Sequence, residues 1–62
     1  MMKILLDHEF VEFAYTLDSF LNKLKLNCYE IEDISYSSNN AYIYILCCHE
    51  NENLLYVLRE DN

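Results

Sequence analysis

Residues 41–49, with the sequence Ala-Tyr-Ile-Tyr-Ile-Leu-Cys-Cys-His, form the stretch that most constrains how this chain can fold. Its β-branched and aromatic residues predict a β-strand. Successive side chains of a strand point to opposite faces, and in this stretch both faces are apolar. A strand of an antiparallel sheet with one face in water would alternate apolar and polar residues. The stretch therefore predicts a sheet that is covered on both sides.

The chain has few residues with which to cover both faces of such a sheet. With 62 residues it makes a single domain, residues 1–62, and a domain of this size buries only about 60% of the surface of its unfolded chain. Three cysteines leave one over in any disulfide pairing, and no secretory signal pattern opens the sequence. We therefore expect a reduced, cytoplasmic protein whose small core needs support from a partner.

The net charge limits the classes of partner that this chain is expected to bind. Eleven acidic residues against four basic ones give a net charge of −7, which favours a protein partner with a basic surface and disfavours direct binding of nucleic acid or of a membrane surface. No apolar run approaches the roughly 20 residues that span a bilayer. The sequence contains no glycine, which common phosphate-binding loops require, so we expect no cofactor.

The first half of the chain reads as a strand followed by a helix. Residues 1–6 are apolar apart from Lys3 and predict a strand. From about residue 8, apolar residues recur at helical spacing, with Asp7 as the expected N-cap and Asn27 as the expected left-handed stop. The residues of this stripe are Phe10, Phe13, Leu17, Phe20, Leu21 and Leu24.

The second half predicts three strands, over residues 28–37, 41–49 and 54–59, separated by polar turns at 37–40 and 50–53. The apolar alternation of the first of these strands changes phase at Glu32 and Asp33, which a β-bulge would correct. The expected fold class is α+β, in the order β-α-β-β-β, with one amphipathic helix on a small, mostly antiparallel sheet. A right-handed crossover would make the first two strands parallel.

One helix covers only one sheet face. With His49 opposite Leu54, a first face would hold Ile45, Cys47, Tyr56 and Leu58. The other face would leave an apolar patch that we expect to form a twofold homodimer interface. This patch consists of Tyr44, Leu46, Cys48, Leu55 and Val57. The strand tyrosines have two readings, ordinary strand packing and partner contact.

Catalysis and metal binding are not expected. Cys47 and Cys48 are neighbours on a strand and point to opposite faces, so they cannot readily share a metal ion, and a buried free cysteine acts as a small hydrophobe. The alternative is a zinc site in which Cys47 and His49 are joined by His8 or Cys28. His8 beside Glu9 has the composition of an acid–base pair, but both residues fall where a helix is expected to begin and exposed polar residues are common.

The acidic residues also have two readings. They can form a solvated surface, or they can imitate the phosphates of a nucleic acid and enter a basic groove. Two pairs have about the spacing of successive phosphates: Glu30 and Glu32 on one strand face, at roughly 6.6 Å, and Glu9 and Glu12 on the helix, at roughly 5–6 Å. The candidate partner-binding residues are Glu9, Glu12, Glu30, Glu32 and Asp33.

The chain resembles small phage-encoded anti-defence proteins, among them anti-CRISPR inhibitors, in its acidity, its lack of Gly and Pro and its composition rich in Asn, Ile, Tyr and Leu. The segment Asp33-Ile34-Ser35-Tyr36-Ser37 after an amphipathic helix is also similar to a family of sporulation-associated proteins of about sixty residues. The first resemblance implies a non-enzymatic inhibitor of a host nucleic-acid-handling or defence protein, acting in the bacterial cytoplasm. The alternative is a homodimeric host regulatory or structural protein such as a sporulation factor.

Overall fold

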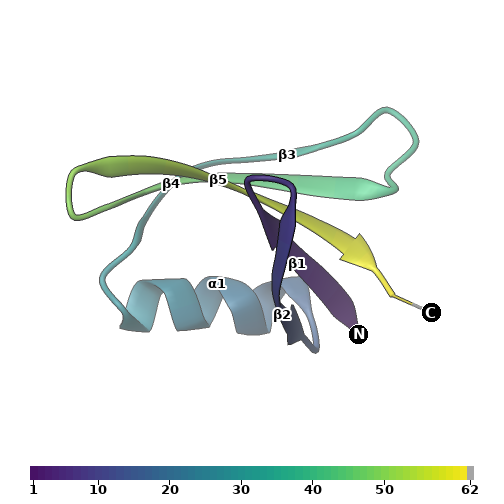
Figure 1. The fold of residues 1–62 in the computed structure, drawn as a ribbon, viewed down its shortest axis with the longest axis horizontal. Helices are drawn as coiled ribbons and strands as arrows, with labels where there is room; N and C mark the ends of the chain where they lie inside the picture. Colours follow the sequence, from purple (N-terminus) through teal and green to yellow (C-terminus); the bar gives the residue numbers. More distant parts are fainter. Residues whose placement is uncertain (62) are drawn as a thin grey trace.

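The computed structural model describes residues 1–61 and consists of one helix and a five-stranded sheet, in the order β-β-α-β-β-β (Figure 1). The elements are β1 (Met2–Leu6), β2 (Glu9–Ala14), α1 (Leu17–Leu26), β3 (Glu30–Tyr36), β4 (Tyr42–His49) and β5 (Glu52–Glu60). The α+β class is confirmed. The expected β-α-β-β-β order is wrong, because it lacks β2.

The sheet has the strand order β2-β1-β5-β4-β3, and every neighbouring pair is antiparallel. The last strand, β5, therefore lies at the centre. The expected parallel orientation of the first strand and the strand after the helix is wrong, since three antiparallel steps separate β1 from β3. The helix instead connects β2 to β3, the two edge strands, which run in the same direction because an even number of antiparallel steps separates them.

The strand β2 occupies residues that were expected to begin the helix. Asp7, the expected N-cap, and His8 instead make the two-residue turn between β1 and β2, with φ of 52° and 67°. Phe10 and Phe13 lie on the same face of β2 because the register shifts by one residue between them, at Val11. A bulged strand therefore reproduces the i, i+3 spacing that we assigned to a helix.

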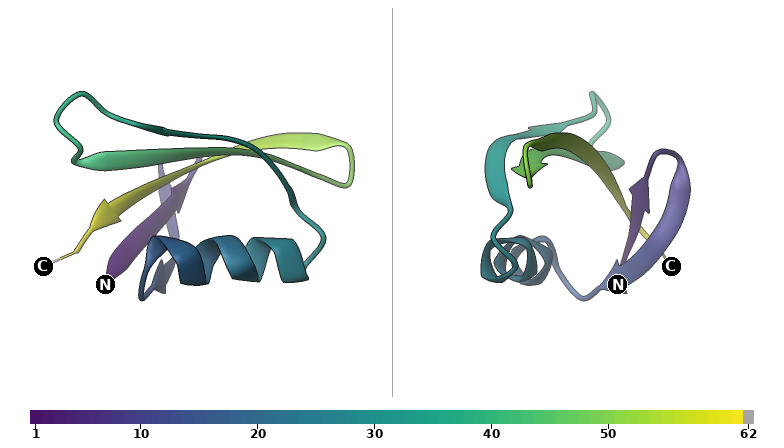
Figure 2. Two further views of the ribbon diagram at one scale, coloured as in Figure 1. Left: turned by 180° about the vertical axis from the view of Figure 1, so that it is seen from behind. Right: turned by 60° about the vertical axis from the view of Figure 1, so that its left-hand side comes forward.

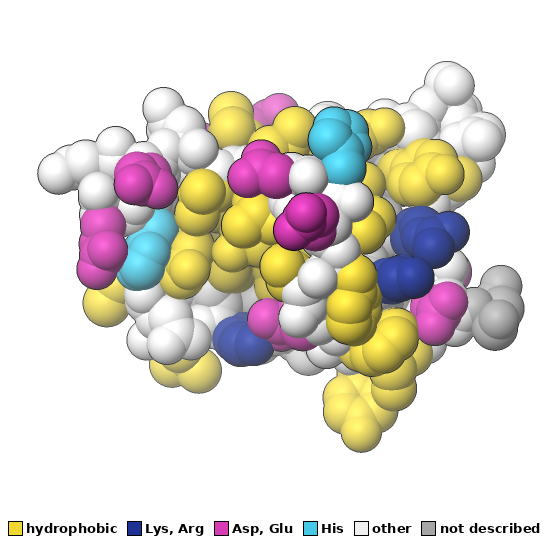
Figure 3. Space-filling model, viewed as in Figure 1, with side chains coloured by type: hydrophobic (Ala, Val, Ile, Leu, Met, Phe, Trp, Pro, Cys, Tyr) yellow, Lys and Arg dark blue, Asp and Glu magenta, His cyan; other side chains and the backbone are white. Residues whose placement is uncertain are grey.

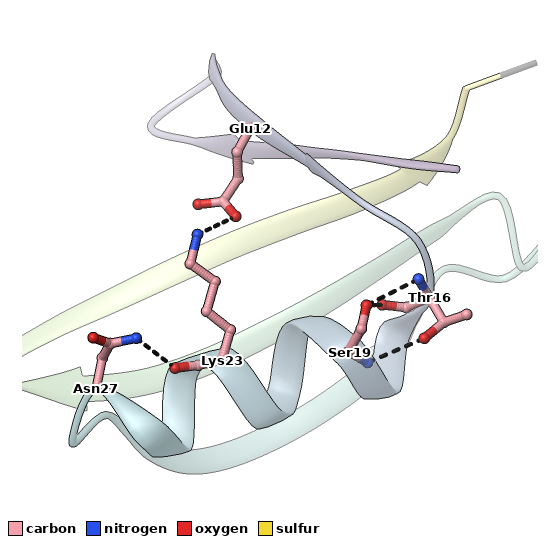
Figure 4. A network of polar contacts seen from close by, with 5 residues as sticks. All are labelled: Glu12, Thr16, Ser19, Lys23 and Asn27. Atoms are coloured by element: carbon pink, nitrogen blue, oxygen red, sulfur yellow. Dashed lines mark hydrogen bonds and ion pairs between the residues drawn. The ribbon is translucent and has the colours of Figure 1, made fainter.

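The helix begins at Leu17, where Thr16 and Ser19 form a capping box. The Ser19 N–H donates to Thr16 Oγ1 at 3.0 Å, and the Thr16 N–H donates to Ser19 Oγ at 3.1 Å (Figure 4). At the other end Cys28 takes the left-handed conformation, with φ of 65°, and the Tyr29 N–H bonds to the Leu24 carbonyl at 2.9 Å. The expected stop was Asn27, so the prediction was one residue early.

The bulge expected in the strand after the helix is confirmed. Ile31 pairs with Cys47 and Asp33 with Leu46, so Glu32 is the extra residue of β3. The bulge places Ile31 and Ile34 on one face, where both pack against the core.

The two following turns are also present, with one difference of register. Residues 37–40 turn between β3 and β4, with Asn40 at φ of 58°. Glu50 and Asn51 form a two-residue turn with φ of 52° and 66°, so His49 lies opposite Glu52 and not opposite Leu54 as expected. A shift of two residues leaves every side chain on its face, and the expected division of β4 and β5 into two faces survives.

The sheet curves around the helix, so that it has a concave and a convex face (Figure 2). The concave face and α1 enclose the core, where Phe20 meets Tyr56 edge-on at 5.2 Å between ring centroids. The buried residues are Met2, Ile4, Phe20, Leu24, Ile45, Cys47, Tyr56 and Leu58. Within residues 1–61, no helix has the length and apolar character needed to cross a membrane.

Candidate functional site

The convex face is an apolar sheet surface that the helix leaves uncovered. The strand registers place the five residues of the expected dimer patch on it, together with Lys3, Leu5, Phe10, Phe13, Tyr42, Arg59 and, on β3, Glu30 and Asp33. Leu46 and Leu55 are directly opposite each other on β4 and β5 and are 40% and 48% exposed. Contiguous exposed apolar surface of this kind is typical of interaction sites.

The sequence pattern missed the part of this face that β1 and β2 contribute. Phe10 and Phe13 were assigned to the helix core, but they are 46% and 48% exposed and contact each other at 4.8 Å between centroids. The adjacent Leu5 on β1 extends the apolar surface from these rings to β5. The one local signal is that Asp7 and His8 are residue types that adopt positive φ more readily than most, as a two-residue hairpin turn requires.

A hollow of about 250 Å³ lies in the convex face. It is lined by Leu5, His8, Tyr42, Tyr44 and Val57, so its walls come from β1, the β1–β2 turn, β4 and β5. Apart from the His8 ring and the tyrosine hydroxyls, its side chains are apolar, and it suits an apolar side chain of a partner better than a charged ligand.

The charges of the convex face are segregated. Lys3 and Arg59 are directly opposite each other on β1 and β5. Lys3 Nζ also lies 5.5 Å from the centroid of the Phe10 ring. Glu30 and Asp33 lie on the same face at the far edge, opposite Cys48 and Leu46. Figure 3 shows basic side chains gathered beside exposed hydrophobic ones toward the right of the view.

The five acidic residues proposed for partner binding do not form one cluster. Glu30, Glu32 and Asp33 are together on β3, whereas Glu9 and Glu12 are on β2, at the opposite edge of the sheet. The helical spacing expected for Glu9 and Glu12 is wrong, because both belong to a strand. The regular strand spacing expected for Glu30 and Glu32 is also wrong, because Glu32 is the extra residue of the bulge.

Glu12 also has an intramolecular partner. Its carboxylate accepts a bond from Lys23 Nζ of α1 at 2.6 Å (Figure 4). The pair connects β2 to the helix, so of the acidic candidates the three on β3 remain the coherent group.

The cysteines and histidines are dispersed. Cys47 is buried in the core and Cys48 lies on the convex face, as the strand alternation predicted. Burial, followed by the neighbouring Cys48 and Glu32, raises the pKa of the Cys47 thiol, which disfavours the nucleophilic thiolate. His49 stacks on Tyr29 at 3.9 Å, while His8 lies in the β1–β2 turn. Among residues 1–61, no three His, Cys, Asp or Glu side chains are placed to hold a metal ion.

A second hollow, of about 360 Å³, lies between α1 and the concave face. Three of its polar side chains interact within the chain: Glu12 pairs with Lys23, and the Asn27 amide donates to the Lys23 carbonyl at 2.8 Å (Figure 4). Burial, with the Tyr29 side chain as a second cause, raises the pKa of Tyr56, which keeps that hydroxyl neutral. The Glu12–Lys23 pair therefore connects α1 to β2 at the edge of this hollow.

Comparison of the chain with models of known protein families, with curated protein sequences and with solved structures found no match.

Proposed function

We propose that this chain is a non-enzymatic binding protein that modulates another macromolecule by direct contact. The observation that carries the proposal is the convex face, on which large apolar side chains stay exposed, whereas the buried core residues of the sheet lie on its concave face. A chain this small gains stability by covering such a surface with a partner.

The specific form that we favour is an inhibitor of a nucleic-acid-handling or defence protein in the bacterial cytoplasm, encoded by a phage. Support comes from the acidic edge, which we define as Glu30, Glu32 and Asp33 on β3. All three are exposed, and none has an ion-pair partner within residues 1–61. A row of free carboxylates at a sheet edge suits a basic groove built for phosphates.

The experiment is affinity capture from a bacterial lysate with the wild-type chain and with the variant Glu30→Gln/Glu32→Gln/Asp33→Asn. We expect the wild type to retain a nucleic-acid-binding protein that excess duplex DNA displaces and that the variant does not retain. Capture of the same proteins by both chains, or retention that DNA does not affect, would contradict the inhibitor proposal. The variant Glu9→Gln/Glu52→Gln serves as the control, because it removes exposed carboxylates away from the acidic edge.

A second candidate is a homodimeric regulatory or structural protein of a bacterial host. The convex face favours this candidate, because a patch that meets its own copy needs no other partner to be covered. If self-association and target binding use overlapping residues, the dimer and the target compete for the same surface of the chain.

A further inference from the structure

We propose that the convex face binds a second copy of this chain across a twofold axis that passes at Tyr44, with Lys3 and Arg59 of each copy on Glu30 and Asp33 of the other. The inference deepens the homodimer candidate above and rests on it, since it specifies which residues meet and which charges pair.

Charged and apolar side chains of the convex face lie along two diagonals. Moving one strand across and two residues along, the registers lead from Lys3 to Val57, then to Leu46 and to Glu30. Each step is about 8 Å, from a strand separation of about 4.8 Å and a rise of about 3.3 Å per residue. This diagonal begins with a cation, crosses two apolar residues and ends with a carboxylate.

The second diagonal repeats the pattern beside the first. The same step leads from Arg59 to Tyr44 and from Tyr44 to Asp33. It also begins with a cation and ends with a carboxylate, and its middle residue is Tyr44. The bulge at Glu32 is what places Asp33, and not its neighbour, in this line.

A twofold axis that lies in the plane of the interface, perpendicular to the two diagonals, reverses both diagonals at once. Lys3 then faces Glu30 of the second copy, Arg59 faces Asp33, Val57 faces Leu46, and Tyr44 faces itself. An isologous interface requires this self-complementarity, in which residue i meets j while j meets i.

The charges of the convex face also favour this pairing. Lys3 and Arg59 are two of only four basic residues in the chain. They are directly opposite each other, where like charges destabilise a sheet. Within residues 1–61 neither has an ion pair, and Glu30 and Asp33 have none either. The second copy would supply the opposite charge at all four positions, which complements the face in both directions.

The shape of the convex face also favours this pairing. Leu46, which is 40% exposed, would face Val57 of the other copy, and Val57 lines the hollow of about 250 Å³. Each leucine would therefore enter the hollow of the opposite copy. We expect so small a patch to bury roughly 600 Å² per chain, at the low end of specific interfaces, and the dissociation constant to lie in the micromolar range.

The test uses two charge-reversed variants, Lys3→Glu/Arg59→Glu and Glu30→Lys/Asp33→Lys. Each alone places like charges across the axis, and we expect it to sediment as a monomer at concentrations where the wild type is dimeric. Mixed in equal amounts they restore opposite charges at every contact, and we expect a heterodimer. The variant Glu9→Lys/Glu52→Lys is the control; it changes exposed charges outside the convex-face pairing and should remain a dimer.

Two results would overturn the proposal. The first is a wild-type chain that stays monomeric at several hundred micromolar. The second is a wild-type dimer together with variants that stay monomeric when mixed, because the pairing would then be wrong. Far-UV circular dichroism of each variant checks that it is folded.

A cross-linking measurement covers the case in which a charge-reversed variant fails to fold. In a Cys28→Ser/Cys48→Ser background, Tyr44→Cys should be joined to its own copy by a short bismaleimide, since sheets pack about 10 Å apart. Arg59→Cys should not, because positions 59 of the two copies are separated by about 16 Å in the plane as well. Cross-linking at 59 but not at 44 would overturn the proposed axis.

The same variants separate this inference from the inhibitor proposal. Lys3→Glu/Arg59→Glu cannot pair with itself but keeps the acidic edge, so it should still capture the DNA-displaceable protein from the lysate. Glu30→Lys/Asp33→Lys should lose both dimer and capture. A chain that dimerises as proposed but captures nothing contradicts the inhibitor alone.

Discussion

Adjacent residues of β4 have opposite surroundings. Cys47 on the concave face is fully buried, whereas Leu46, one residue earlier on the convex face, is 40% exposed. Both faces are apolar in sequence, and only the concave one is covered by α1. Apolar composition therefore does not decide burial in a small domain; the supply of covering elements does, and one ten-residue helix covers one face.

The largest expected difference between the two faces is in phenylalanine truncation. Phe20→Ala should destabilise the fold by about 3–5 kcal/mol, because it empties a fully packed site in the core. Phe13→Ala, on the convex face, should cost less than about 1.5 kcal/mol as a monomer, since the ring is 48% exposed. Urea unfolding at a concentration below dimer formation measures both. Equal losses would mean that the convex face is packed within the chain.

A charge placed on the convex face should act on association. Leu46→Glu should abolish the dependence of the melting temperature on protein concentration, which in the wild type corresponds to about 2.7 kcal/mol at one hundred times the dissociation constant. Glu12→Gln, a change in a residue outside the convex face, should keep that dependence. A wild-type melting temperature that does not vary with concentration would remove the dimer from the comparison.

The concave face should make stability fall at alkaline pH. Burial raises the pKa of Cys47 above its ordinary value of 9.0 and that of Tyr56 above 10.0. Each group holds its proton more tightly in the folded state, so the stability it contributes is complete below the ordinary pKa and decreases as the pH rises above it. Each should lower the unfolding free energy by up to about 1.4 kcal/mol per pH unit.

Urea unfolding between pH 8 and 11 measures this slope. Cys47→Ala should remove the decrease that begins near pH 9, and Tyr56→Phe the one that begins near pH 10. A slope unchanged in both variants would show that other groups cause the alkaline loss.

The smallest expected effect is that of the N-terminal cap of α1, the helix that covers the concave face. Thr16→Ala removes the acceptor for the Ser19 N–H and should cost about 1 kcal/mol. Ser38→Ala, in the exposed turn before β4, is the matched hydroxyl deletion and should be nearly neutral. Thermal unfolding distinguishes the two, and equal melting temperatures would indicate that the helix depends on packing alone.

Several features were determined by the sequence itself because they are local. The phase change at Glu32 and Asp33 required a bulge, and the polar residues at 37–40 required a turn. The alternation of β4 and β5 divided their side chains into two faces, and this division survived an error of two residues in register. The predicted patch from Tyr44 to Val57 lies on the uncovered face for the same reason.

Only the tertiary structure decided what residues 9–14 become and where each strand lies. The spacing of Phe10 and Phe13 fits a helix and a bulged strand equally well, and pairing with β1 selects the strand. Strand order depends on contacts between residues far apart in the chain, which no local pattern encodes. Lys3 and Arg59 meet Phe10 and Phe13 on one face because β5 inserts beside β1, so this part of the candidate interface came from the fold and not from the sequence.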